Sequence, residues 1–179
     1  MCYRCGLLSL FLLVTCSATV DAEFVVGAST QVITPDPLLP ITGGMGPTEP
    51  ATGKQGELTV RAIAIGSGSQ RMAIVSVDAL GFPSVLGDRA RSQIRDIPAE
   101  YVMIGATHTH SAPDCYAFPD GQGGHTGNLD FMNDVCNKIA AAVNQAWSTA
   151  RPAAMKAATG EVRGKVAYNY YAPDLYDRR

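Results

Sequence analysis

Hydrophobic and polar residues alternate over several short stretches of the chain, a pattern that predicts β-strands. Residues 23–34 (EFVVGASTQVIT) are expected to form one or two short strands, ended by the proline-rich stretch PDPLLP. Residues 57–66 (ELTVRAIAIG) and 71–80 (RMAIVSVDAL) follow, and the SGSQ between them predicts a hairpin turn. Residues 100–110 (EYVMIGATHTH) predict a further strand. Four regions of the chain thus favour β-structure.

Two other stretches have the periodicity of amphipathic helices. Ser84 is a candidate N-cap for a helix over residues 85–97, and Asn128 for a second helix that ends near Ala150. The apolar face of the first helix contains Leu86, Ala90, Ile94 and Ile97, and its arginines (Arg89, Arg91, Arg95) lie elsewhere. In the second helix the apolar residues step by four: Phe131, Val135, Ile139, Val143 and Trp147.

A final strand pair is expected at residues 153–162 (AAMKAATGEV) and 164–171 (GKVAYNYY). The order strand, helix, strand, helix, strand requires at least one parallel pair joined by a crossover helix. We therefore predict an α/β fold with a mixed sheet and crossover helices, in a domain over residues 23–179 that is incomplete. Asp78 ends one strand and His110 another, so these residues share an edge of the sheet if the two strands are parallel.

Composition and charge narrow the function classes. The 179 residues suit one domain, and 46% hydrophobic with 17% charged residues is typical of a folded globule. The net charge of −2 gives no electrostatic reason to expect nucleic acid or an anionic membrane as a partner.

The first 22 residues resemble an export signal, with Arg4, the apolar stretch GLLSLFLLVT and a small-residue cleavage site ending at Ala22. The apolar stretch is too short to span a bilayer, and we expect no transmembrane span in the mature chain. The protein is therefore expected to be secreted or periplasmic. Lipoprotein anchoring through Cys16 is the lesser alternative.

Cleavage would leave Cys115 and Cys136 as the cysteines of the mature chain. In an oxidising compartment they could form a disulfide. The favoured alternative makes Cys136 a small buried residue on a helix and Cys115 a loop thiol.

The stretch GATHTHSAPD (105–114) contains two of the three histidines of the chain. In an extended strand, His108 and His110 would point to the same face, about 7 Å apart, where two imidazoles can converge on one metal ion. Asp78, Thr107 and Ser111 are candidates for orienting those rings through hydrogen bonds. Two solvated histidines at a strand end are the alternative.

A catalytic zinc site needs about three protein ligands. His125, Asp114 and Asp120 are the local candidates for a third ligand, although His125 among glycines favours a solvent-facing side chain, and both aspartates are typical turn residues. The sixteen residues 41–56, with five glycines and two prolines, form a long loop that is either functional or a surface excursion.

GATHTHSAPD resembles the G-T-H-T-H-S-x-P stretch of the neutral/alkaline (non-lysosomal) ceramidase family, near the start of its catalytic domain. VVGASTQVITP, ELTVRAIAI, MAIVSVDALGF and GEVRGKVAYN are similar to family segments in the same order. The resemblance implies zinc-dependent hydrolysis of the amide bond in N-acylsphingosine (ceramide)-like lipids, which releases fatty acid and sphingoid base. It assigns His108 and His110 as zinc ligands and places Ser111 beside them.

In the family, a further histidine, a glutamate, a tyrosine and the serine associated with catalysis lie well downstream of this motif. They would fall beyond Arg179 in this numbering. We therefore expect an amino-terminal fragment that is inactive alone. The alternatives are a small secreted metal-binding protein, which uses both histidines with His125 or Asp114, and an exported binding domain that keeps the scaffold without catalysis.

Overall fold

The computed structural model of the protein describes residues 24–43 and 50–161. The expected export signal (1–22) and the expected strand 164–171 lie outside these ranges and stay predictions. Within the described residues, no helix is long and apolar enough to cross a membrane.

The described residues contain one mixed sheet with the strand order β4-β3-β2-β1-β5. Strands β1 to β3 are consecutive antiparallel neighbours, and β3 is parallel to β4. The parallel pair is joined through a helix, so the predicted α/β fold with a mixed sheet is confirmed. The strand bounds are β1 (Phe24–Val32), β2 (Thr59–Ser67), β3 (Gln70–Val77), β4 (Val102–Ala106) and β5 (Arg151–Pro152).

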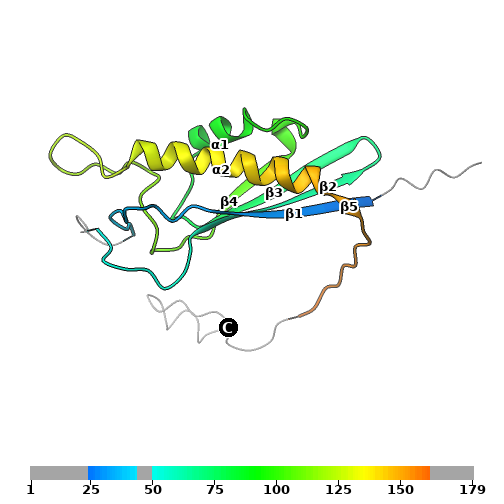
Figure 1. Ribbon diagram of the computed structural model, residues 1–179, viewed down its shortest axis with the longest axis horizontal. Helices are drawn as coiled ribbons and strands as arrows, with labels where there is room; N and C mark the ends of the chain where they lie inside the picture. Colours follow the sequence, from blue (N-terminus) through cyan, green and yellow to red (C-terminus); the bar gives the residue numbers. More distant parts are fainter. Residues whose placement is uncertain (1–23, 44–49, 162–179) are drawn as a thin grey trace, which may run out of the picture.

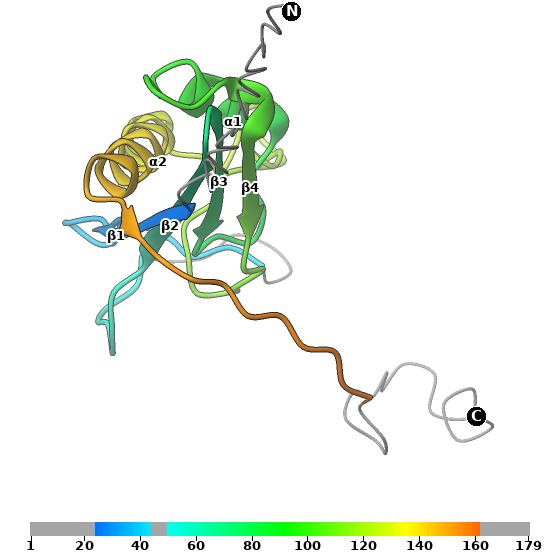
Figure 2. The same cartoon turned by 90° about the vertical axis from the view of Figure 1, so that its right-hand side faces the viewer.

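Two α-helices of the described chain, α1 (Ser84–Arg91) and α2 (Leu129–Ser148), lie on the same face of the sheet (Figures 1 and 2). The alternating small and β-branched residues of β2 and β3 face them and are buried: Val60, Ala62, Ala64, Ala73, Val75 and Val77. The apolar stripe of α2 completes this core with Phe131, Val135, Ile139 and Val143. The core therefore lies between the helices and one side of the sheet.

The start of α2 agrees with the predicted cap. The Asn128 side chain accepts a hydrogen bond from Phe131 N at 2.9 Å, which satisfies one of the amides that a helix leaves unpaired at its first turn. Asp130 lies in that first turn, where the helix dipole favours a negative charge.

The prediction for α1 was wrong at both ends. The N-cap is Pro83 in an extended conformation, without a side-chain cap, so Ser84 is the first helical residue. The helix ends at Arg91, and Ser92 Oγ donates to Arg89 O at 2.8 Å, where a polar side chain competes with the main-chain ladder. Ile97 is still buried, from a bend that follows the helix, and Pro98 then precedes a short 3-10 helix, η1 (Ala99–Tyr101).

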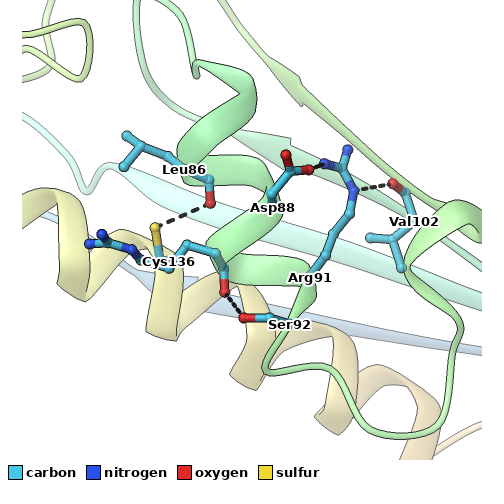
Figure 3. Close-up of polar contacts among 7 residues, drawn as sticks. Leu86, Asp88, Arg91, Ser92, Val102 and Cys136 are labelled. Atoms are coloured by element: carbon cyan, nitrogen blue, oxygen red, sulfur yellow. Dashed lines mark hydrogen bonds and ion pairs between the residues drawn. The ribbon is translucent and has the colours of Figure 1, made fainter.

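Polar contacts hold α1 between α2 and the edge strand (Figure 3). Cys136 Sγ on α2 donates to Leu86 O at 3.4 Å, and Arg91 Nε donates to Val102 O of β4 at 3.0 Å. Asp88 Oδ1 accepts from Arg91 Nη1 at 3.0 Å and steadies that arginine. A helix of about two turns is thereby fixed next to the strand that leads to the histidines.

The predicted strand at residues 153–162 is not formed in its described part, because residues 153–161 have no regular structure. β5 is antiparallel to β1, with Arg151 opposite Val26 and Pro152 opposite Val25, and Ala153 N donates to Phe24 O at 2.9 Å. In the described chain, β5 is therefore a two-residue strand that pairs with the start of β1.

The sheet face opposite the helices carries exposed apolar side chains. Ile63 (46% exposed), Ile74 (38%) and Met103 (60%) are direct neighbours in register across β2, β3 and β4. Met72, 41% exposed, lies on the same face two residues before Ile74. An apolar row of this kind on a sheet face is typical of a surface that another layer covers.

Candidate functional site

The carboxyl ends of β3 and β4 meet at one edge of the sheet, as predicted. Val77 and Ala106 are paired, and Thr107 N donates to Val77 O at 2.9 Å, one residue past the strand. Asp78, however, turns toward β2: its Oδ2 accepts from Thr59 N at 2.9 Å and from Thr59 Oγ1 at 2.8 Å. Its carboxylate is thus used to tie two strand ends together.

The histidines follow the strand and are not part of it, because β4 ends at Ala106. The strand alternation that we expected to align the two side chains therefore does not apply. Instead, His108 has φ 61°, a left-handed conformation that is uncommon for a residue other than glycine. This turn places the His108 and His110 rings with their centroids 5.1 Å apart and nearly perpendicular, at 84°.

The His108 ring has a defined orientation. Its Nδ1 lies 2.7 Å from Leu80 O, and a carbonyl oxygen only accepts, so Nδ1 carries the proton. In the neutral ring, Nε2 then has the free lone pair. A histidine that binds a metal through one nitrogen and donates from the other to a main-chain carbonyl has this arrangement. Leu80 lies on the segment that follows β3, so the two neighbouring strands cooperate in holding the ring.

Both imidazoles line a cleft of about 680 Å³. Besides the histidines, its walls come from three places in the sequence: the segment before residue 44, the segment that follows β3 and the loop after the histidines. Apolar and polar groups share the lining, among them Ile41, Leu80, Phe118, Asp114 and Thr126. The cleft therefore combines two basic ring nitrogens with an apolar rim.

Asp114 organises the loop that follows the histidines. It is 4% exposed, and its carboxylate accepts from Tyr116 N at 2.7 Å, Phe118 N at 2.9 Å and Thr126 Oγ1 at 2.5 Å. The expected turn role is confirmed, although a buried carboxylate was not expected. These bonds bring Phe118 to the rim of the cleft.

Asp120 and His125 lie on the outer part of the same loop and are exposed. Asp120 Oδ1 accepts from Gln122 N at 2.8 Å and Gly124 N at 2.9 Å, and these hydrogen bonds lower the pKa of the carboxyl. Within residues 24–43 and 50–161, no three His, Cys, Asp or Glu side chains are grouped so that they could hold a metal ion. Asp114, Asp120 and His125 therefore do not complete a three-ligand site with the two histidines in this part of the chain.

Of the other predicted positioning residues, Thr107 contributes its main-chain amide to the sheet edge. Ser111 N donates to Thr109 Oγ1 at 3.3 Å, and Ser111 lines a neighbouring cleft of about 430 Å³. The assignment of Thr107, Ser111 and Asp78 to the support of a metal site stays a prediction, as does the assignment of His108 and His110 as zinc ligands.

The two cysteines of the described residues, Cys115 and Cys136, are free thiols and buried, with Cys115 4% and Cys136 0% exposed. Burial, and secondarily the neighbouring Asp114 charge, raises the pKa of Cys115 to about 12. The favoured interpretation of a buried helical cysteine and a loop thiol is therefore confirmed.

Two main-chain features of the site escaped the sequence analysis. The Leu80 carbonyl holds His108, and Gly43 packs against His110. A carbonyl has no sequence signature. Gly43, in contrast, lies in the glycine-rich stretch 41–56 that was predicted as a possible functional loop, and this richness in glycine was the available signal.

Known proteins share this fold. The chain is similar to the crystal structure of neutral ceramidase from Pseudomonas aeruginosa, with a TM-score of 0.61 and 19% sequence identity over 74% of this chain. A second structure, a ceramidase complexed with C2, matches with a TM-score of 0.58 and 20% identity over 74% of this chain. The match spans 22% of each of those chains. No protein-family model and no curated protein matches the sequence.

At 19% and 20% sequence identity, these similarities show that the fold is shared. The α/β fold of the described chain is the fold of a part of the two ceramidase structures, as the sequence resemblance implied. The shared fold defines the scaffold as ceramidase-like, and the cleft that His108 and His110 line is the candidate place for its chemistry.

Proposed function

We propose that this chain is the amino-terminal part of a zinc-dependent amidase of the neutral ceramidase family, which hydrolyses N-acylsphingosine-like lipids to fatty acid and sphingoid base. Three findings support the proposal: the ceramidase-like fold, the T-H-T-H-S sequence at the end of β4, and the cleft that both imidazoles line. Export through the signal at residues 1–22 belongs to the same proposal.

The observation that carries the proposal is the fixed tautomer of His108. Because Nδ1 donates to Leu80 O at 2.7 Å, Nε2 is unprotonated in the neutral ring and available to a Lewis acid. The adjacent His110 ring supplies a second nitrogen donor at a centroid distance of 5.1 Å. Imidazole nitrogens are preferred zinc ligands, so the donor set fits that metal.

Zinc at this site would polarise the amide carbonyl or activate a water molecule for attack. The residues of this chain would hold the ion through His108 and His110 and line the approach to it. The Asp114 hydrogen bonds keep the loop with Phe118 at the rim of the cleft, where an apolar side chain can contact a lipid chain.

The remaining ligands would come from further polypeptide. The match spans 22% of each ceramidase chain, so most of a protein of that kind lies outside this fold. The exposed row Ile63, Ile74 and Met103 supports this proposal, because further polypeptide packed on the open sheet face would cover it.

The test is an assay of N-acylsphingosine hydrolysis. We expect no turnover from residues 23–179 alone, and zinc-dependent turnover from the product of a longer reading frame that continues past Arg179. His108→Ala and His110→Ala in the longer product should each abolish turnover, whereas His125→Ala, a change to an exposed histidine of the same loop, should not. Full turnover by a His108→Ala, His110→Ala double variant would refute the proposal.

A further inference from the structure

A segment distant in sequence from the histidines lies directly against them. Thr42 N donates to Ala112 O at 2.9 Å, so residues 41–43 run beside the chain that leaves His110. Gly43 follows, with φ 103°, and lines the same cleft as His110. The glycine is therefore part of the wall of the site, contributed by the long loop before β2.

The contact between Gly43 and the His110 ring leaves no room for a side chain. A Cβ built on Gly43 would lie 2.5 Å from His110 Nδ1 and 2.6 Å from His110 Cγ. Real Cβ atoms essentially never lie closer than 3.0 Å to another heavy atom, and both of these distances are shorter than that. These distances put the added Cβ over the face of the imidazole, beside the Nδ1–Cγ bond, so the bare main chain of Gly43 packs against one face of the ring.

We infer that Gly43 is a positioning residue: its bare main chain packs against the face of the His110 ring and holds the ring in the cleft beside His108. The His108 ring is held by a different contact, since its Nδ1 is engaged by Leu80 O. The identity of the ligand, Zn²⁺, rests on the proposed function. The contact does not depend on the metal.

The experiment compares Gly43→Ala with Gly53→Ala and Gly123→Ala in the 23–179 chain. An added Cβ meets nothing within 4 Å at either control position. Gly53 lies in the same loop as Gly43, and Gly123, with φ 90°, has the same kind of left-handed backbone as Gly43 with φ 103°. Zn²⁺ titration by calorimetry should show about tenfold weaker binding for Gly43→Ala, the size expected when the support of a metal ligand is lost. The controls should bind as the unchanged chain does.

A double-mutant cycle shows whether the effect passes through the imidazole. In a His110→Ala background the ring is absent, so Gly43→Ala should cause no further loss of Zn²⁺ affinity. This background removes the steric clash but keeps the backbone strain at φ 103°, so a loss that persists in it is an effect of the backbone and not of the ring contact.

A measurement without metal separates the two proposals. In the zinc-free protein, the Gly43 α-protons should show nuclear Overhauser contacts to the His110 ring, and the ¹⁵N shifts should change at His110 in Gly43→Ala while those of His125 do not. Absence of these contacts, equal effects of Gly43→Ala and its controls, or an additive loss in the His110→Ala background would overturn the inference. If the contacts are present and residues 23–179 bind no Zn²⁺, the positioning role stands, and the zinc assignment of the proposed function fails only if the longer product binds none either.

Discussion

Replacing Asp114 tests how the loop after the histidines is held. Its carboxylate is 4% exposed and accepts from Tyr116 N, Phe118 N and Thr126 Oγ1. Asp114→Ala leaves these donors without their partner. A hydrogen bond to a charged group contributes about 1.5 to 3 kcal/mol, and part of this is recovered when water reaches the exposed loop. We therefore expect a loss of about 3 kcal/mol in the free energy of unfolding.

Urea denaturation followed by fluorescence of Trp147, the single tryptophan of the chain, measures this loss. Asp120→Ala is the matched control, because Asp120 accepts main-chain hydrogen bonds in the same loop but is exposed. Its effect should be much smaller, since water replaces those bonds. Equal stabilities of the two variants would refute the assignment of Asp114 as the buried organiser of the loop.

Three further predictions test other parts of the structure. Asn128→Ala removes the cap on Phe131 N and should lower the unfolding free energy by about 1 kcal/mol, measured by thermal circular dichroism, whereas no change would exclude the cap. Val75→Ala in the core should cost about 2 kcal/mol in urea denaturation and Met103→Ala on the open sheet face less than about 0.5 kcal/mol; a reversed order would contradict the one-sided core. Burial raises the pKa of Cys115 to about 12 from an ordinary value of 9.0, so its thiol ionises first in the unfolded chain. Stability should be unaffected by this group below the ordinary value and should fall by about 1.4 kcal/mol per pH unit between the two values. A Cys115→Ala variant should lack this component of the decline, and identical pH profiles would contradict it.

The long elements were predictable because their patterns are repetitive. The four-residue steps from Phe131 to Val143 and the cap at Asn128 specify α2 by local sequence alone. The hairpin of β2 and β3 follows in the same way from alternation and a polar turn. The end of α1 was not predictable from periodicity, because Ile94 and Ile97 keep the apolar spacing of a helix while packing from the segment that follows it.

The candidate site was predictable in its residues and not in its geometry. The H-x-H pattern identified His108 and His110, but the rings meet through a left-handed residue and not through strand alternation. The positions of Leu80 O and Gly43 are set by tertiary contacts between segments about 30 and 70 residues away from the histidines, which single-sequence patterns do not encode. Asp78 shows the opposite case: it lies at the predicted sheet edge, but its carboxylate is bonded to Thr59.

The central claim is that His108 and His110 bind a zinc ion that further polypeptide helps to hold. The most direct measurement is the zinc bound, as a function of free Zn²⁺, by the product of a longer reading frame that continues past Arg179, with its His108→Ala, His110→Ala double variant measured beside it. We predict saturable binding that is lost in the double variant and that shifts the imidazole ¹⁵N signals of His108 and His110. Zinc binding that is equal in the two proteins, or that leaves both imidazoles unperturbed, would contradict the account.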